Sequence, residues 1–375
     1  MRDLVEIGMG RSARRAYDLQ QIEIVPSRRT RTSQEVSTHW QLDAYRFDIP
    51  LVTHPTDAIV SPATAVRVGQ LGGLGVLNAE GLWARHADPA AQLARLVEAA
   101  DKEDPTAVVR LLQELHTAPI QPELLTEALR QVREAGVTLA ARVSPQRARE
   151  LTPHLLAAGV EILFVQGTII SAEHVSSAGQ PLNLKQFIND LDVPVVAGGV
   201  GDYRTAMHLM RTGAAGVLVG YGESLATTTD TVLGIGVPMA TAIVDAAAAR
   251  RDYLDETGGR YVHVLADGGI YGSGDIAKAI ACGADAVMLG EQLAEASEAP
   301  GAGLYWTPAA AHPSLPRSDV TGVGLADRDL EHVLFGPSDS PDGTVNLFGA
   351  LRRALAKTGY SDLKEFQRVG LTIRR

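Results

Sequence analysis

The chain is poor in cysteine, in aromatic residues and in positive charge, and it has no long apolar run. A single cysteine among 375 residues excludes an intrachain disulfide and a thiolate metal cage, and it fits a reducing cytoplasm. A net charge of −10 disfavours nucleic acids and anionic membranes as partners, because both attract basic proteins. No apolar run approaches the roughly 20 residues of a membrane span, and the start MRDLVEIGMG lacks the apolar core of a signal peptide. We therefore expect a cytoplasmic protein.

Aliphatic residues dominate the apolar part of the chain. Hydrophobic residues make up 45% and aromatic residues 5%, so the core must consist mainly of Val, Ile, Leu and Ala, as in buried parallel strands covered by helices. Eight short apolar runs recur, and several end in Gly or Asp, which predicts strands that end in loops. The runs are residues 49–53, 73–77, 137–143, 160–166, 193–199, 215–220, 261–269 and 284–290.

Amphipathic stretches separate these runs. ELLTEALRQVREAG and YRTAMHLMRTG are examples, and their final Gly is a natural helix C-cap. Eight strand–helix alternations predict an α/β fold of the (β/α)8 TIM barrel type, and the chain length suits one such domain of roughly 250 residues with additions. An open doubly wound sheet is the alternative.

Three segments do not fit the repeat. We expect residues 1–47 to form an N-terminal arm, with the basic run PSRRTRT in solvent, before a barrel of residues 48–375. Residues 78–136 are helical in pattern and longer than one crossover needs. Residues 294–348, rich in Ala, Pro, Gly, Ser and Asp, predict a flap-like or disordered excursion, and residues 349–375 a closing helical segment.

The clearest candidate site is ADGGIYGSGDIAKAIACGADAVMLG, residues 266–290. Asp267 ends the seventh run, Gly268 and Gly269 allow a close backbone approach, and a helix follows. Glycine amides beside a helix N-terminus form a phosphate cradle, and TIM barrels often bind phosphate after strands seven and eight. The sequence therefore predicts a phosphorylated ligand.

These residues resemble a known family. DGGI…SGDIAKA…GADAVMLG is similar to the phosphate-binding segment of IMP dehydrogenase and GMP reductase. IPLVTHPTDAIVSP, GGLGVLN and VPVVAGGV are similar to that family's first, second and fifth strands, and VGYGESLATTTDTVLGIGVP matches its catalytic loop without gaps. The start GMGRSARRAYDLQQIEIVPSRRTR further resembles the actinobacterial IMP dehydrogenase-related branch. Because residues 78–136 are too few for the family's paired CBS (Bateman) modules, we expect a barrel without that insertion.

The resemblance implies a reaction. In the family, a cysteine thiolate adds to C2 of IMP, hydride leaves to NAD, and a flap arginine helps water to release XMP. The implied activity is NAD-dependent oxidation of IMP to XMP in guanine nucleotide biosynthesis. The resemblance also implies a homotetramer, and it allows a monovalent cation held by loop carbonyls.

The catalytic loop departs from the family. The cysteine position holds Thr227, the arginine of the family's CTTR motif becomes Asp230, and Thr229 keeps one of its threonines. Thr227 and Thr229 are thus the catalytic residues by position. A threonine hydroxyl is a poor nucleophile without an adjacent base. The flap region contains no Arg-Tyr pair of the family's kind, and Arg317 is the candidate flap cation.

The nucleotide-holding half is retained. The resemblance assigns Asp267 to the ribose hydroxyls and the glycine amides of strands seven and eight to the phosphate. It assigns two further glycines to the shape of the central loop and an aspartate to the top of strand one. The predicted nucleotide-binding residues are Asp57, Gly220, Gly222, Asp267, Gly268, Gly269 and Gly290.

Other positions around the predicted ligand have changed. Gln166 stands where the family has the Asp of IDTAHG, and Gly199 replaces an Asn, near purine and nicotinamide. Glu291 replaces a phosphate-binding Ser. A carboxylate about 4 Å from a phosphate costs about 4 kcal/mol per pair of unit charges at an effective dielectric of 20. Glu291 must therefore turn away, pair with a cation, or mark an altered ligand.

The remaining reactive side chains give weaker signals. Cys282 precedes the eighth strand and so faces the other end of the barrel, where it is expected to be a small buried hydrophobe. His54, His174 and His312 fall near strand ends or in the flap and are candidate acids or bases. No HExxH or paired-His spacing indicates a metal, so no metal site is expected.

Three functions remain open from the sequence. The first is NAD-dependent oxidation of IMP. The second is a catalytically silent, IMP dehydrogenase-related paralogue that binds a purine nucleotide as a sensor or as a partner of a true dehydrogenase. The third is a flavin-dependent barrel, because a similar phosphate motif holds FMN in related folds.

Overall fold

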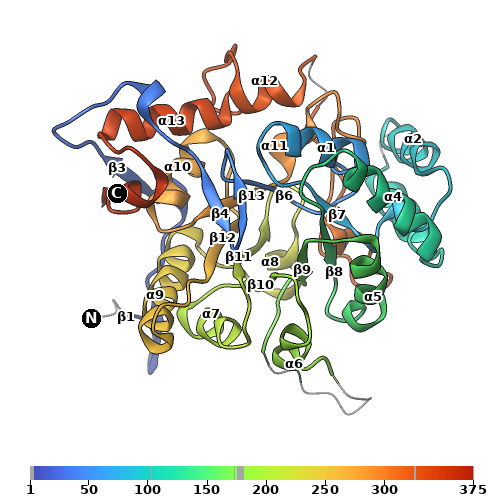
Figure 1. The fold of residues 1–375 in the computed structure, drawn as a ribbon, viewed down its shortest axis with the longest axis horizontal. Helices are drawn as coiled ribbons and strands as arrows, with labels where there is room; N and C mark the ends of the chain where they lie inside the picture. Colours follow the sequence, from blue (N-terminus) through green and yellow to red (C-terminus); the bar gives the residue numbers. More distant parts are fainter. Residues whose placement is uncertain (1–3, 103, 173, 175–180, 325–326, 375) are drawn as a thin grey trace.

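Eight parallel strands form the centre of the molecule. The computed structural model describes residues 4–102, 104–172, 174, 181–324 and 327–374, and Figure 1 shows the strands in the middle with helices around them. Each strand lies within or overlaps one of the eight predicted apolar runs. The strands are β6 (Leu51–Thr53), β7 (Val76–Asn78), β8 (Ala140–Val143), β9 (Ile162–Gln166), β10 (Val195–Val200), β11 (Gly216–Glu223), β12 (His263–Gly268) and β13 (Ala286–Leu289).

The strands close into a barrel. Their hydrogen-bonded order is β6-β13-β12-β11-β10-β9-β8-β7, all parallel. A parallel bridge between Val52 and Leu74 joins β6 to the segment before β7 and completes the circle. The prediction of a (β/α)8 TIM barrel is confirmed. The open doubly wound sheet is wrong because the first strand, β6, pairs with the last, β13, and is bridged to the segment before β7.

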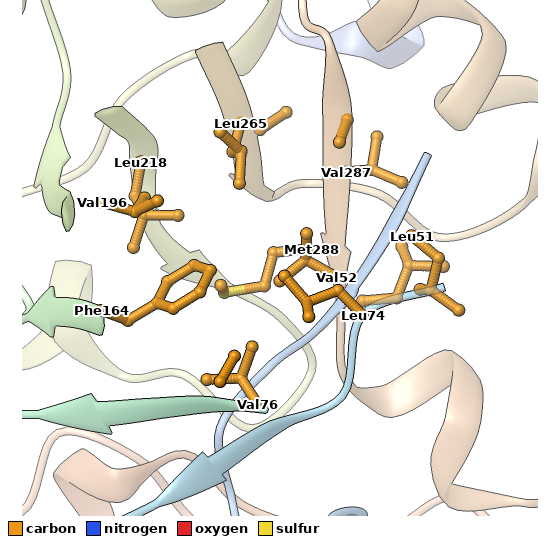
Figure 2. Close-up of a cluster of buried hydrophobic side chains, with 14 of the residues drawn as sticks. Leu51, Val52, Leu74, Val76, Phe164, Val196, Leu218, Leu265, Val287 and Met288 are labelled. Atoms are coloured by element: carbon orange, nitrogen blue, oxygen red, sulfur yellow. The ribbon is translucent and has the colours of Figure 1, made fainter. Parts of the chain in front are cut away.

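The strand side chains meet in a buried aliphatic core (Figure 2). A strand enclosed on both faces must be apolar throughout, which is why the runs show little alternation of apolar and polar residues. Each of the core residues labelled in Figure 2 is at most 3% exposed. They are Leu51, Val52, Leu74, Val76, Phe164, Val196, Leu218, Leu265, Val287 and Met288.

A helix follows each strand and covers the barrel. Local signals set their ends: Ser61 caps α1 by accepting from the Thr64 amide, and α5 ends at Gly159 in the left-handed conformation. The helices are α1 (Pro62–Gln70), α4 (Pro122–Glu134), α5 (Ala148–Ala158), α6 (Leu184–Asn189), α7 (Tyr203–Met210), α9 (Met239–Thr257), α10 (Ser273–Ala281) and α13 (Leu347–Thr358). No helix in the described residues is long and apolar enough to cross a membrane.

The long connection between β7 and β8 is helical, as its pattern predicts. It contains the turn η3 (Leu82–Ala84) and helices α2 (Pro89–Ala100) and α3 (Pro105–Leu115) before α4. Asp88 and Asp104 cap α2 and α3 through their carboxylates, each with Pro next in the chain. Figure 1 shows α2 and α4 at one side of the barrel.

The N-terminal arm carries short elements of its own. They are β1 (Leu4–Gly8), β2 (Arg11–Arg14), η1 (Leu19–Gln21), β3 (Ile22–Val25), η2 (Ser33–Glu35), β4 (Trp40–Leu42) and β5 (Tyr45–Phe47). β3 pairs antiparallel with β16 (Gly370–Ile373), so the arm is tied to the end of the chain. The basic run at residues 26–32 is exposed. Residues 1–3 of the predicted arm lie outside the described part.

The excursion after β13 is packed onto the barrel over most of its described length. It contains α11 (Glu291–Ala294), a β14 (Leu304–Tyr305) and β15 (Thr321–Gly322) ladder, η4 (Pro308–Ala311) and α12 (Leu330–Phe335). Tyr305 and Trp306 are among the largest fully buried side chains of the protein. Residues 325–326 lie outside the described part. The closing segment holds α13 and α14 (Leu363–Phe366) and then ends in strand β16, which the helical pattern did not predict.

Candidate functional site

A cavity of about 620 Å³ opens at the carboxyl ends of the strands. This volume is within the range of small-molecule sites, and the location is where TIM barrels place their function. Five strand ends contribute His54, Asn78, Arg142, Gln166 and Asp267. Further lining comes from the loops above the strands, which include Glu80 and Arg85 and residues 144–147, 167–169, 221–233 and 307–317.

Asp267 lies at the end of β12, where its predicted ribose role would require it. Its Oδ2 accepts from Gln166 Nε2 at 2.9 Å, and His54 Nε2 lies 4.0 Å from its Oδ1. Burial, reinforced by the charge of Glu223, raises the pKa of Asp267 to about 7. The carboxyl group therefore exchanges its proton near neutral pH, as an acid or base in a site would.

The raised pKa makes the stability of the protein depend on pH. An unfolded aspartate has a pKa of about 3.9, so between about pH 4 and pH 7 the folded chain keeps a proton that the unfolded chain releases. The free energy of unfolding contributed by Asp267 should fall as the pH rises through this window, by about 1.4 kcal/mol for each unit of pKa difference. Urea unfolding from pH 4 to 8 measures it. Asp267→Asn should remove this slope, and parallel wild-type and variant curves would contradict the assignment.

His54, which follows β6, is neutral in the fold. Burial, and then the charge of Arg142, lowers its pKa to about 3. Its Nδ1 is buried without a partner among the described residues. His54 therefore lines the cavity as an uncharged side chain at physiological pH. His312 also lines the cavity, with its Nδ1 accepting from the Leu315 amide at 2.8 Å, and His174 is exposed.

Thr227 sits in the loop between β11 and α8 (Thr229–Leu233) and lines the cavity with Thr229. Its hydroxyl donates to the Gly222 carbonyl and lies 3.0 Å from Ser224 Oγ. Among the described residues, no hydrogen bond joins this hydroxyl to a histidine or a carboxylate. The proton of Thr227 is thus held by a carbonyl, which is not a base.

The excursion after β13 docks directly on this loop. Thr227 forms an antiparallel bridge with Ser318, the Thr228 amide donates to the Arg317 carbonyl at 2.9 Å, and the Asp319 amide donates to Ala226 at 2.7 Å. Arg317 lines the same cavity as Thr227. The candidate flap cation is therefore next to the position of the family's cysteine.

The predicted phosphate cradle is engaged by the chain itself. The Gly269 amide donates to the Glu223 carbonyl at 2.8 Å, and the Gly290 amide donates to Gln292 Oε1 at 3.3 Å. A cavity of only about 20 Å³ remains between Gly222, Gly268 and Gly290. A Cβ at position 290 would lie 2.2 Å from the Tyr305 hydroxyl, which shows how closely that ring covers the glycine.

Carboxylates fill the remaining space of the cradle. Glu291 does not turn away: it is 8% exposed, and its Oε2 accepts from the Leu225 amide at 2.6 Å. Glu223 Oε2 accepts from the Tyr221 amide at 3.0 Å and lies beside Gly268. Burial raises the pKa of Glu223, Asp267 and Glu291 alike. Acidic side chains thus occupy the place predicted for a phosphate.

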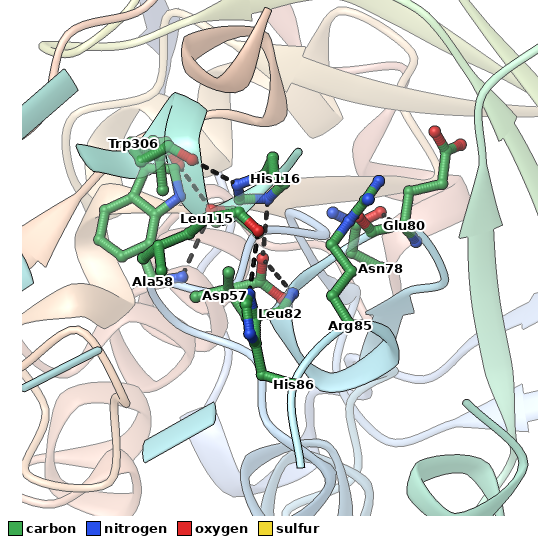
Figure 3. A network of polar contacts seen from close by, with 12 residues as sticks. Asp57, Ala58, Asn78, Glu80, Leu82, Arg85, His86, Leu115, His116 and Trp306 are labelled. Carbon is green, nitrogen blue, oxygen red and sulfur yellow. Dashed lines mark hydrogen bonds and ion pairs between the residues drawn. The ribbon is translucent and has the colours of Figure 1, made fainter. Parts of the chain in front are cut away.

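Asp57 is not part of the cavity wall. Figure 3 shows it beside Leu82 of η3 and His116: its Oδ2 accepts from the Leu82 amide at 3.1 Å and lies 3.7 Å from His116 Nε2. Of the other predicted residues, Gly222 lines the cavity, and Gly220 is buried and packs closely against the backbone of Asp267. Cys282 is 6% exposed and lies at the end of α10, and burial raises the pKa of its thiol to about 12.

The sequence prediction did not include an arginine cluster on the β7–β8 side. Arg85, Arg142 and Arg147 line the cavity there, with Glu80 between them. Arg142 donates to the Gln166 carbonyl at 2.7 Å and to Glu80 Oε1 at 3.4 Å. The signal was present in the apolar run VTLAARV, because a charged residue inside a fully buried strand needs a specific reason.

The chain is similar to a known protein family and to individual known proteins. Residues 16–310 match the family described as IMP dehydrogenase / GMP reductase domain. An "uncharacterized oxidoreductase" of Mycolicibacterium smegmatis is 67% identical over 373 residues, covering 99% of this chain and all of that protein. Inosine-5′-monophosphate dehydrogenase of Haemophilus influenzae is 43% identical over 147 residues, covering 39% of this chain and 28% of that enzyme.

A solved structure agrees. The crystal structure of an IMP dehydrogenase/GMP reductase-like protein from Corynebacterium glutamicum is 56% identical, has a TM-score of 0.95, and covers 99% of this chain and 98% of that one. The family predicted from the sequence motifs is therefore confirmed. This chain belongs to the IMP dehydrogenase/GMP reductase family.

Proposed function

We propose that this chain binds a purine nucleotide in the 620 Å³ cavity and does not oxidise it through a thiol adduct. It is thus a catalytically silent paralogue within the family. The observation that carries this proposal is the state of Thr227, whose hydroxyl donates to the Gly222 carbonyl. An alcohol attacks a purine ring only when a base takes its proton, and the hydrogen bond to a carbonyl supplies none.

The positions near the predicted nicotinamide differ from those of the family. Gln166 stands at the family's Asp position and is turned to Asp267. A Cβ at Gly199 would lie 2.0 Å from the Gly220 carbonyl oxygen, so this backbone leaves no room for the family's Asn. No hydride-transfer step is therefore assigned to this chain, and the use of NAD stays a prediction from the resemblance.

The cavity supports binding without catalysis. It is open, it is lined by polar strand-end groups, and Asp267 exchanges a proton near neutral pH. An FMN phosphate would need the same strand-end amides that the chain already engages, so a flavin enzyme is not proposed.

An absorbance assay for NADH tests the proposal. With IMP and NAD, the wild type should produce NADH at least about 1,000-fold more slowly than an IMP dehydrogenase with its cysteine, such as the Haemophilus influenzae enzyme, because loss of a nucleophile alone costs that much or more. Thr227→Cys alone should stay inactive, since Glu291 and Gln292 still hold the cradle amides.

A thermal-shift series on the same samples tests binding. IMP, GMP or XMP at millimolar concentration should raise the melting temperature of the wild type by mass action. NADH formation by the wild type at an ordinary turnover rate would refute the proposal that the chain is catalytically silent. A flat melting temperature with all three nucleotides would refute nucleotide binding.

Several finer statements stay predictions. The resemblance implies the homotetramer, a monovalent cation at the loop carbonyls and a place in guanine nucleotide biosynthesis. Composition and sequence pattern imply a cytoplasmic location and the division of the chain into arm, barrel, flap-like excursion and closing segment. Sensing of purine nucleotides or partnership with a true dehydrogenase would both use the same binding event.

A further inference from the structure

The cavity has two walls of opposite charge. On the β11–β13 side Asp267 lines the cavity, and Glu223 and Glu291 line the adjoining space of about 20 Å³ where the family resemblance places a phosphate. The β7–β8 side carries three arginines instead. Ionised carboxylates repel a dianionic phosphate, and protonated ones leave it without a counter-charge. The charge distribution therefore favours a ligand whose anion lies on the arginine side.

Arg142 is built into this wall. It is 9% exposed, projects from β8, and its Nε is buried without a partner among the described residues. Burial lowers its pKa, which marks a charged group held in a costly position. A buried guanidinium with an unused N–H gains most from an anion that arrives with a ligand.

Nearby carboxylates do not neutralise the cluster. Glu80 lies 3.4 Å from Arg142 Nη1 and 3.9 Å from Arg147 Nε. Glu150 pairs with Arg147 on the exposed side at 3.3 Å, and Asp57 lies behind the wall with His116. Arg85 donates from Nε to the Glu80 carbonyl at 2.8 Å and from Nη1 to the Ala118 carbonyl. Figure 3 shows Arg85, Glu80 and Asn78 grouped together. Within the cavity, the Glu80 carboxylate is thus shared between the guanidiniums of Arg142 and Arg147.

Arg317 adds a fourth cation to the cavity from the excursion after β13. Its backbone is fixed by hydrogen bonds to Thr228 and Ala309. Its Nε is buried without a partner, and it forms no ion pair within the described residues. An arginine held at a cavity with an unused buried donor is prepared for an anionic group.

We propose that the ligand's phosphate lies at the arginine wall of Arg142 and Arg147, opposite the family's glycine cradle, with Arg317 closing on it from the excursion. The inference rests on the proposed function, because it specifies how the nucleotide lies in the same cavity. It reverses the ligand relative to the orientation that the family motif implies. Arg142, Arg147 and Arg317 become the specificity-determining residues, and Glu291 becomes the group that excludes the cradle.

Calorimetric titration with IMP and inosine tests this arrangement, because the two differ in the phosphate. The wild type should bind IMP at least about 10-fold more tightly than inosine, and only the IMP affinity should fall with salt. Arg317→Gln and Arg147→Gln should each weaken IMP by about 10-fold, the loss of one charged hydrogen bond, and leave inosine unchanged. These two variants are chosen because Arg142 is too buried to replace safely.

Two control variants make the result decisive. Arg352→Gln removes an exposed arginine of α13 and should change neither affinity. Glu291→Ser restores the family's residue, and in this background Arg147→Gln should still weaken IMP by about 10-fold, since the phosphate lies at the arginine wall. If Glu291→Ser tightens IMP about 10-fold or more while the arginine variants bind normally, the phosphate uses the cradle and the inference is overturned.

The test separates the two proposals. Equal wild-type affinities for IMP and inosine would overturn the arginine-wall inference and leave nucleotide binding intact. Binding of neither compound would overturn the proposed function itself.

Discussion

Replacing Asp285 with alanine is expected to lower the free energy of unfolding by about 3–5 kcal/mol, the usual cost of removing one partner of a buried ion pair. Asp285 precedes β13 at the amino-terminal end of the barrel and is 3% exposed. It accepts from Arg250 Nη1 at 2.8 Å, from Lys364 Nζ at 2.5 Å and from Tyr261 Oη at 2.8 Å. Without it, the buried Arg250 has no counter-charge in this network. Urea unfolding followed by circular dichroism measures the change.

The pH dependence of the Asp285 effect gives a second check. Arg250 and Lys364 outweigh burial and lower the pKa of Asp285. A carboxyl whose folded pKa is lowered stabilises the protein above its unfolded pKa of about 3.9, and that stability is lost as the pH falls below it. The wild type and Asp285→Ala should therefore differ most at neutral pH. Asp255→Ala, at an exposed position near the end of α9, should change stability by less than about 0.5 kcal/mol. Equal losses in both variants would contradict the assignment.

Gly220→Ala should be nearly as damaging and should also disturb the candidate site. Gly220 has φ = 113°, a conformation that residues with a Cβ rarely adopt. An added Cβ would lie 2.1 Å from the Asp267 carbonyl oxygen and 2.9 Å from Met239 Sδ. Either β11 or β12 must move, and a loss of at least about 3 kcal/mol is expected. Because Asp267 moves with its backbone, nucleotide binding in the thermal-shift series should weaken in the same variant.

Gly234→Ala provides the matched control for this substitution. Gly234 also has a positive φ, 67°, at the end of α8, but a Cβ there would meet nothing within 4 Å. The cost should be about 1 kcal/mol, from the backbone conformation alone. The difference between the two variants isolates the collision with Asp267. Equal costs would mean that β11 and β12 are not packed as closely as described.

Asp267 and Asp285 show how neighbouring structure sets the chemistry of identical side chains. Both are 3% exposed, and burial by itself would raise the pKa of each. Asp285 is surrounded by cations, so its charge is kept and serves stability. Asp267 faces Glu223 and a single amide donor, so its pKa stays raised to about 7 and the group is able to exchange a proton. One end of the barrel thus holds the fold together, and the other carries the candidate site.

The sequence by itself determined the barrel and the family. The strand runs are short and apolar because each strand is covered on both faces, and they are punctuated by Gly and Asp where the chain turns. Those are local patterns, and the ungapped catalytic loop also fixed the position of Thr227. Loss of the nucleophile was therefore readable without a structure.

Only the tertiary structure decided what the site can hold. The sequence placed Glu291 at the cradle and left its direction open, whereas in the fold it accepts the amide of Leu225, 66 positions away. Asp57 matches a family position, but in the fold it binds the Leu82 amide of η3 and not the cavity. Arg142 was not predicted as a site residue because it stands inside an apolar run, yet it lines the cavity. Side-chain direction and the pairing of buried charges depend on groups distant in sequence, and in a low-dielectric interior those groups decide which ligand atoms are accepted.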